Sequence, residues 1–346
     1  MNKFGDKLFC IQNMNHVRIF TFLLLLFAVS FNAVSQEDTN AKTFTYEELY
    51  DNPYDISKLF IQVQPFYGEF YTTNVNVGFG VETKFYHREI FDIGAHFRTA
   101  FGSSFEMTRN AADKNSDVDN QPRAYNYFEI VGTYHIVDRE EDTETKFILY
   151  SKRYKGAKWA ATVPLHTIVP TKMRRIYGVR AGGLSYVTAV DYNKVMENQG
   201  VVITTDEGEP IDTDLSIYGD MDAKGFYLGG SITLIKNVAV QPDRIYGTLV
   251  NDLIFTAFLD FIITPSVNVK DIFLDGVPYR ADEIKTSFLG IRAGMEGRFN
   301  RKVGWGYGAE MGWRPGIEGE GLYATVKISF PIFSTKLNYQ VESFGK

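Results

Sequence analysis

The sequence predicts an all-β protein, an antiparallel up-and-down transmembrane β-barrel of about twelve strands, with about ten to fourteen also compatible. Three observations support this fold class. The chain begins with a short apolar leader, polar and apolar residues then alternate along most of its length, and the longest connections recur at one end of the expected barrel. The 346 residues include 30 Gly and are 15% aromatic, which suits strands with an aromatic surface.

Residues 1–35 have the pattern of a secretory signal peptide. Arg18 precedes the apolar run 19–34, and Ala33-Val34-Ser35 supplies the small residues of a cleavage site. The strongly apolar core spans only about a dozen residues, whereas a membrane-spanning helix needs about 20. The single cysteine, Cys10, lies in this leader, so the remaining chain excludes a disulfide framework and a cysteine-based metal site.

Residues 36–57 are predicted to form a periplasmic N-terminal leader. Thr45 and Glu48 fit a capping box and Pro53 follows them, which predicts a short helix in this segment. Such a helix would lie under the barrel mouth or contact a partner. A leader without regular structure is the alternative interpretation.

The barrel itself is expected over residues 58–333, followed by a C-terminal tail at 334–346. In 73–86, for example, Val77, Phe79 and Val81 alternate with Gly78 and Gly80. Most segments reach the roughly 9–11 residues that a tilted transmembrane strand needs. The expected strands are 58–68, 73–86, 91–105, 124–136, 146–154, 158–169, 174–190, 225–237, 245–263, 284–299, 303–314 and 321–333.

The lengths of the connections give an independent argument. With the N-terminus in the periplasm, the long polar connections 106–123, 191–224 and 264–283 all fall on the outer side. Shorter turns, which include 137–145 and 170–173, then fall on the periplasmic side. Outer-membrane barrels have this asymmetry.

Alternation alone does not decide which face of the sheet points outward, because a lipocalin-like barrel places its apolar face inside. Aromatic residues near the strand ends favour a membrane barrel with its polar face inside. The inward face then has seven basic and seven acidic residues, a balance that suits a confined lumen. The side chains expected to line the lumen are Glu82, Lys84, Asp92, His96, Arg98, Glu129, Arg180, Asp252, Asp260, Arg292, Glu296, Arg298, Glu310, Arg314 and Lys327.

The chain resembles outer-membrane β-barrel proteins of the Bacteroidota type. The resemblance rests on the signal that ends at Ser35, the Gly/aromatic alternation of 289–333, and the last strand ending Phe330-Pro331-Ile332-Phe333. It identifies a class and no subfamily. It implies an outer-membrane location, contact with membrane lipid and lipopolysaccharide, and insertion by the barrel-assembly machinery. Such barrels usually finish on an aromatic residue, whereas here either Phe333 closes the last strand or 337–344 extends the sheet.

No motif for catalysis or metal binding is present. No serine lies in a pattern that specifies a Ser/His pair, and His96 is expected to donate or accept a hydrogen bond in the lumen. Asp113, Asp117 and Asp119 lack the glycine and distal glutamate of a calcium loop. We therefore predict no catalytic residue, no metal and no cofactor, and the net charge of −6 argues against nucleic-acid binding.

Three functions fit these features. A narrow barrel crowded by inward charges predicts a narrow or gated channel for a small solute. The alternative is a non-enzymatic structural or accessory subunit of a larger outer-membrane assembly, such as a secretion complex, with other envelope proteins as partners. A lipid-binding or lipid-modifying barrel is the third interpretation.

Overall fold

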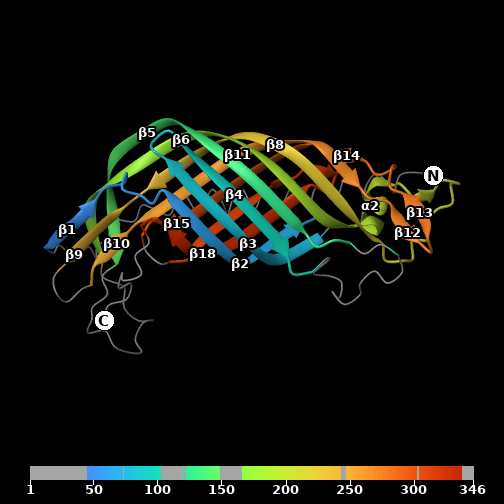
Figure 1. Cartoon of the computed structure of the whole chain (residues 1–346), viewed down its shortest axis with the longest axis horizontal. Coiled ribbons are helices and arrows are strands. Elements are labelled where there is room, and N and C mark those ends of the chain that lie inside the picture. The colour runs from blue at the N-terminus through green and yellow to red at the C-terminus, as the bar shows by residue number, and fades with distance from the viewer. Residues whose placement is uncertain are drawn as a thin grey trace, which may run out of the picture.

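A closed antiparallel barrel forms the centre of the computed structural model, which describes residues 45–72, 74–102, 119, 122–148, 166–242, 247–301 and 304–336 (Figure 1). The fold class is confirmed. In the described residues the barrel has ten strands, and β18 pairs with β2 to close it. The strands are β2 (Leu59–Tyr71), β3 (Asn74–His87), β4 (Phe91–Ala100), β5 (Asn126–Ile148), β6 (His166–Asp191), β8 (Tyr218–Ile235), β11 (Leu253–Val269), β15 (Leu289–Phe299), β16 (Gly306–Trp313) and β18 (Leu322–Ser334).

Two long strands account for the difference between twelve strands and ten. β5 and β6 pair continuously from Asn126↔Val187 to Ile148↔His166, so the predicted turns 137–145 and 170–173 lie inside strands. The predicted strands 146–154 and 158–169 are therefore the ends of β5 and β6 where they are described. Pro170 fits this position because β6 pairs with β8 only from Arg174 onward, which leaves an open edge. Because two predicted strands merge into β5 and β6, every later strand keeps its predicted direction. The long connections therefore still lie at one end of the barrel.

The long connections build a cap at one end of the barrel, which we call the loop cap. It consists of residues 192–217, 270–288 and 314–321. It contains α2 (Tyr192–Gln199), β7 (Thr204–Thr205), β12 (Ile272–Leu274), β13 (Val277–Arg280), β14 (Thr286–Ser287) and β17 (Gly316–Ile317). Asp191 caps α2 by accepting a hydrogen bond from the Lys194 amide at 3.2 Å, and Gly200 ends the helix with a φ of 66°.

The opposite end, which we call the turn end, has a small sheet of its own. β1 (Tyr46–Asp51), β9 (Val238–Pro242) and β10 (Leu249–Asn251) pair in the order β1-β9-β10 (Figure 1). The short helix predicted near Thr45 is wrong, because pairing with β9 overrides the local capping pattern. Val238 and Val240 pack against Phe147 and Val169 on the extended part of β5 and β6.

Burial in the barrel wall is the reverse of that in a water-soluble protein. Along β3 the polar Asn76, Glu82 and Lys84 are buried, whereas Phe79 and Phe85 are about 40% exposed. Other strands repeat this pattern, and the exposed apolar side chains include Phe97, Phe128, Phe226, Leu228, Phe261, Ile291, Val326 and Phe330. The apolar face of the sheet therefore points outward and the polar face points into the barrel. No helix among the described residues is long and apolar enough to cross a membrane.

Candidate functional site

The interior of the barrel holds a network of charged side chains, which we call the lumen network. Alternation along the strands points them inward. Of the predicted lumen residues the structure brings together Glu82, Lys84, Asp92, His96, Arg98, Glu129, Arg180, Asp260, Arg292, Glu296, Arg298, Glu310, Arg314 and Lys327. Asp252 lies elsewhere: it precedes β11 at the turn end and accepts a hydrogen bond from the Arg301 amide at 2.7 Å.

Glu69 belongs to the lumen network and was missed by sequence reasoning. It is fully buried and accepts hydrogen bonds from Arg314 at 2.8 and 3.0 Å. A register shift between Gln64 and Tyr67 moves the inward face of β2 from even to odd positions. Pro65 in the middle of the strand is the signal that could have predicted this bulge. With Glu69 in place of Asp252, the balance of seven acidic and seven basic members is kept.

Arg314 is the first residue of the loop-cap segment 314–321, and its side chain is surrounded by tyrosines. Its guanidinium is 4.0 Å from the ring centre of Tyr323 and 5.0 Å from that of Tyr186. Tyr125 donates a hydrogen bond to Glu69 at 3.0 Å. The ion pair is thus enclosed by aromatic rings that both exclude water and attract a cation.

Asp260 connects the side chains in the middle part of the lumen network. It is fully buried, and it accepts hydrogen bonds from Arg180 at 3.1 Å and from Arg292 at 3.0 Å. Arg292 also pairs with Glu129. The Phe258 ring lies 4.1 Å from the Arg180 guanidinium. These contacts join β5, β6, β11 and β15 across the lumen.

Lys327 of β18 links β3 and β15 toward the turn end. Its ammonium pairs with Glu82 and lies 3.4 Å from Glu296, which also accepts a hydrogen bond from Arg298 at 2.7 Å. Gly308 makes room for this lysine, because a Cβ there would lie 2.4 Å from the Lys327 Cε. The glycines of the inward face are therefore needed for side chains to cross neighbouring strands.

Two histidines lie inside the barrel without forming a catalytic pair. The Nδ1 of His96 is 3.6 Å from a carboxylate oxygen of Glu82. The Nε2 of His135 is 2.9 Å from Asp92, which also pairs with Lys84. Each histidine thus faces a carboxylate that is already paired with a lysine, which is the environment of a structural side chain.

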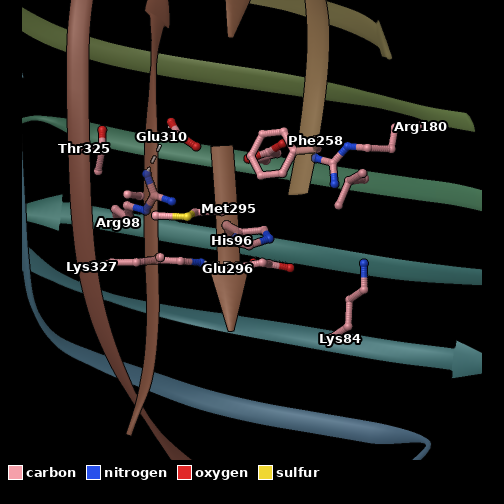
Figure 2. A pocket seen from close by; sticks show the side chains of 14 residues that line it. Lys84, His96, Arg98, Arg180, Phe258, Met295, Glu296, Glu310, Thr325 and Lys327 are labelled. Atoms are coloured by element: carbon pink, nitrogen blue, oxygen red, sulfur yellow. Dashed lines mark hydrogen bonds and ion pairs between the residues drawn. The ribbon is translucent and has the colours of Figure 1, made fainter. Parts of the chain in front are cut away.

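A cavity of about 20 Å³ lies between these groups (Figure 2). It borders Arg98, whose ion pair with Glu310 is long, at 3.9 Å. The Nε of Arg98 and one oxygen of Glu310 have no hydrogen-bond partner among the described residues. The space is enough for about one or two water molecules.

Apolar side chains close both ends of the lumen. Under the loop cap, Tyr192 and Met196 of α2 join Ile217, Ile272 and Ile317 in one buried cluster. At the turn end a second cluster consists of Ile56, Phe60, Tyr86, Ile176, Ile235 and Ile254. Buried apolar side chains thus lie at both ends of the described barrel, and paired charged side chains lie between them.

No protein-family model matches this chain, and no curated protein matches it with significant similarity. Within the described residues, no group of three or more potential metal ligands is present. Asp119 instead accepts a hydrogen bond from the Gly276 amide at 2.7 Å, while Asp113 and Asp117 lie outside the described residues. The fold and the lumen network therefore carry the functional argument alone.

Proposed function

We propose that this protein is an outer-membrane β-barrel of a Bacteroidota-type envelope whose lumen is closed, and that it serves as a structural or accessory subunit of a larger membrane assembly. Its outer surface contacts lipid and lipopolysaccharide, and the barrel-assembly machinery inserts it. Other envelope proteins bind the parts that project from the membrane. The predicted signal peptide at 1–35 supports export, although it lies outside the described residues.

The reversed burial is the observation that carries the membrane location. Exposed apolar surface costs roughly 25 cal/mol per Å² in water, and lipid removes this cost. Exposed Trp305 and Trp313 lie at the two ends of β16, as expected for aromatic belts at membrane interfaces. Fractionation of envelopes tests the location: we expect the folded barrel in the outer-membrane fraction, and recovery in the soluble periplasm would refute it.

The ion pairs that cross the lumen and the apolar clusters at its two ends favour a structural role over a channel. Separating one buried ion pair costs about 3–5 kcal/mol, and an open pore would require several such separations together with loss of both apolar clusters. We therefore expect no ion conductance from the purified chain in planar bilayers. Steady single-channel steps would contradict the proposal. Purification in mild detergent should recover the barrel with envelope proteins, and a monomeric barrel alone would count against an accessory role.

A gated channel for a small solute is the second candidate, and the loose contact between Arg98 and Glu310 beside the cavity favours it. If this gap is the gate of a channel whose apolar ends open in the membrane, Arg98→Ala should permit ion conductance. The outward-facing neighbour Phe97→Ala is the matched control and should stay silent. A silent Arg98→Ala variant that remains folded would refute the gate.

A further inference from the structure

A strap crosses the barrel mouth at the turn end. It consists of residues 52–58, which connect β1 to β2 and lie outside both strands. The Tyr54 ring lies 4.7 Å from the guanidinium of Arg174 on β6. The next residue, Asp55, pairs with Arg301, which follows β15. β6 and β15 belong to different sides of the closed barrel, separated by β8 and β11. The strap therefore spans the mouth and does not only follow its rim.

Ile56 is the part of the strap that enters the barrel. Its side chain is 8% exposed and belongs to the apolar cluster at the turn end. The other members include Phe60, Ile176 and Ile235, which are inward-facing residues of three strands, Ile176 lying two residues beyond the point where β6 begins to pair with β8. One strap residue thus completes an apolar closure whose remaining members come from the barrel wall.

Two buried asparagines hold the strap, and each comes from a different turn. Asn237 donates hydrogen bonds to the carbonyl oxygens of Asn52 at 2.7 Å and Asp55 at 3.1 Å. Asn300 donates to the Asp55 carbonyl at 3.0 Å and accepts a hydrogen bond from the Ser57 amide at 2.6 Å. Both asparagines have no exposed surface. They satisfy strap backbone groups that no sheet partner would satisfy.

We call the hydrogen bonds of Asn237 and Asn300 to the strap the latch. Two cations that pair with Asp55, which we call the clamp, add to it. Arg301 and Lys336 both pair with its carboxylate, and Lys336 follows β18.

The pairs of the barrel wall do not include any residue from 52 to 58. Two backbone hydrogen bonds hold the ends of the strap: the Lys58 carbonyl accepts from the Tyr86 amide of β3 at 2.8 Å, and the Asn52 amide donates to the Asn237 carbonyl at 3.1 Å. The part between them, residues 53–57, can leave the mouth by exchanging its side-chain contacts for water, while the closed sheet keeps its own ladder of hydrogen bonds.

We infer that the strap is a lid over a vestibule at the turn end, closed by the Asn237–Asn300 latch and the Asp55 clamp. On one side the lid is anchored by β1, which pairs with β9, and on the other it continues into β2. Opening exposes the vestibule lined by Phe60, Ile176 and Ile235 and leaves the lumen network shut. The inference goes beyond the proposed function. It uses that function only to say on which side of the membrane the vestibule lies.

Thiol labelling of the full chain tests the lid. Cys10→Ser removes the single cysteine, and Ile235→Cys, a position with no exposed surface, reports on the vestibule. In detergent, a charged maleimide should label the Cys10→Ser, Ile235→Cys protein slowly. Adding Asp55→Ala, which removes the clamp, should raise the labelling rate at least tenfold. Adding Asp206→Ala, which breaks an Asp–Arg pair in the loop cap, is the matched control and should leave the rate within twofold.

A second variant separates lid opening from general unfolding. Ile56→Ala removes the apolar contact and no side-chain hydrogen bond, and it should also raise the rate at least tenfold. The folded barrel is followed by its heat-dependent migration on gels. Unchanged labelling in both variants with the barrel folded would overturn the lid. Loss of the folded barrel in both would also overturn it, because the strap would then be a structural part of the wall. The labelling is measured in detergent, so failure of the membrane assignment would appear only in fractionation.

Discussion

The ion pair between Glu69 and Arg314 gives the sharpest test of the lumen network. Glu69 accepts hydrogen bonds from Arg314 at 2.8 and 3.0 Å and from Tyr125 at 3.0 Å, and it has no exposed surface. Glu69→Ala leaves the Arg314 guanidinium buried without its carboxylate. Removing one partner of such a pair costs about 3–5 kcal/mol. We therefore expect the free energy of unfolding to fall by about that amount, which is a factor of roughly 10² to 10³ or more in the unfolding equilibrium.

The double variant decides whether the cost comes from an unpaired charge. Glu69→Ala with Arg314→Met removes both charges, so it should recover most of the loss. The remaining cost should be about 1–2 kcal/mol, because the contact of the guanidinium with the Tyr323 ring is also lost. The measurement is urea unfolding of the refolded barrel, followed by tryptophan fluorescence. Glu48→Ala, on the exposed face of β1, is the control. A double variant as unstable as the sum of the single variants would refute the reasoning.

Three further outcomes follow from other parts of the structure. Gly308→Val should displace Lys327 and reduce the yield of refolded barrel, as judged by heat-dependent gel migration, and an unchanged yield would contradict the tight approach. Phe261→Arg, on the outward face of β11, should cost about 2–4 kcal/mol of stability in lipid bilayers, and a cost below about 0.5 kcal/mol would argue against a membrane-buried position. In the loop cap, the hydrogen bond from Arg280 lowers the pKa of Asp206 below its usual value near 3.8, so the stability from this pair is full above about pH 4 and is lost as the pH falls through the lowered pKa. A carboxyl titration by NMR should show this lowered midpoint for Asp206, and a midpoint at or above about 4 would contradict it.

The barrel wall could be predicted because its signal is local. A strand with one face in an apolar surrounding and one face in a polar interior has a period of two, and segments such as 73–86 and 303–314 carry this period without interruption. The same period assigned thirteen of the fourteen predicted inward charges correctly to one face, and Asp252 is the exception. It failed at Glu69, because the bulge after Gln64 shifts the period by one residue within β2. It also failed to give the strand number, because the polar segment 137–145 has the composition of a turn although it lies in β5.

The N-terminal segment shows the opposite case. The capping pattern at Thr45 and Glu48 is a local signal for a helix, yet β1 is a strand because β9, almost two hundred residues later, supplies its hydrogen-bond partners. The same holds for the strap, whose latch residues Asn237 and Asn300 come from turns far along the chain. Long-range partners of this kind leave no periodic trace near the segment that they hold.

The amino-acid sequence by itself determined that the chain forms long strands with one apolar face and one charge-balanced face, because side-chain alternation depends only on neighbouring residues, and the aromatic residues near the strand ends favoured the apolar face as the outer one. Only the tertiary structure decided which charges meet, such as Asp260 with both Arg180 and Arg292, and that α2 joins the apolar cluster at one end of the barrel and Ile56 the cluster at the other. These contacts join residues that are far apart in the chain, and closure of the barrel, which pairs β18 with β2, is what brings them within reach of one another.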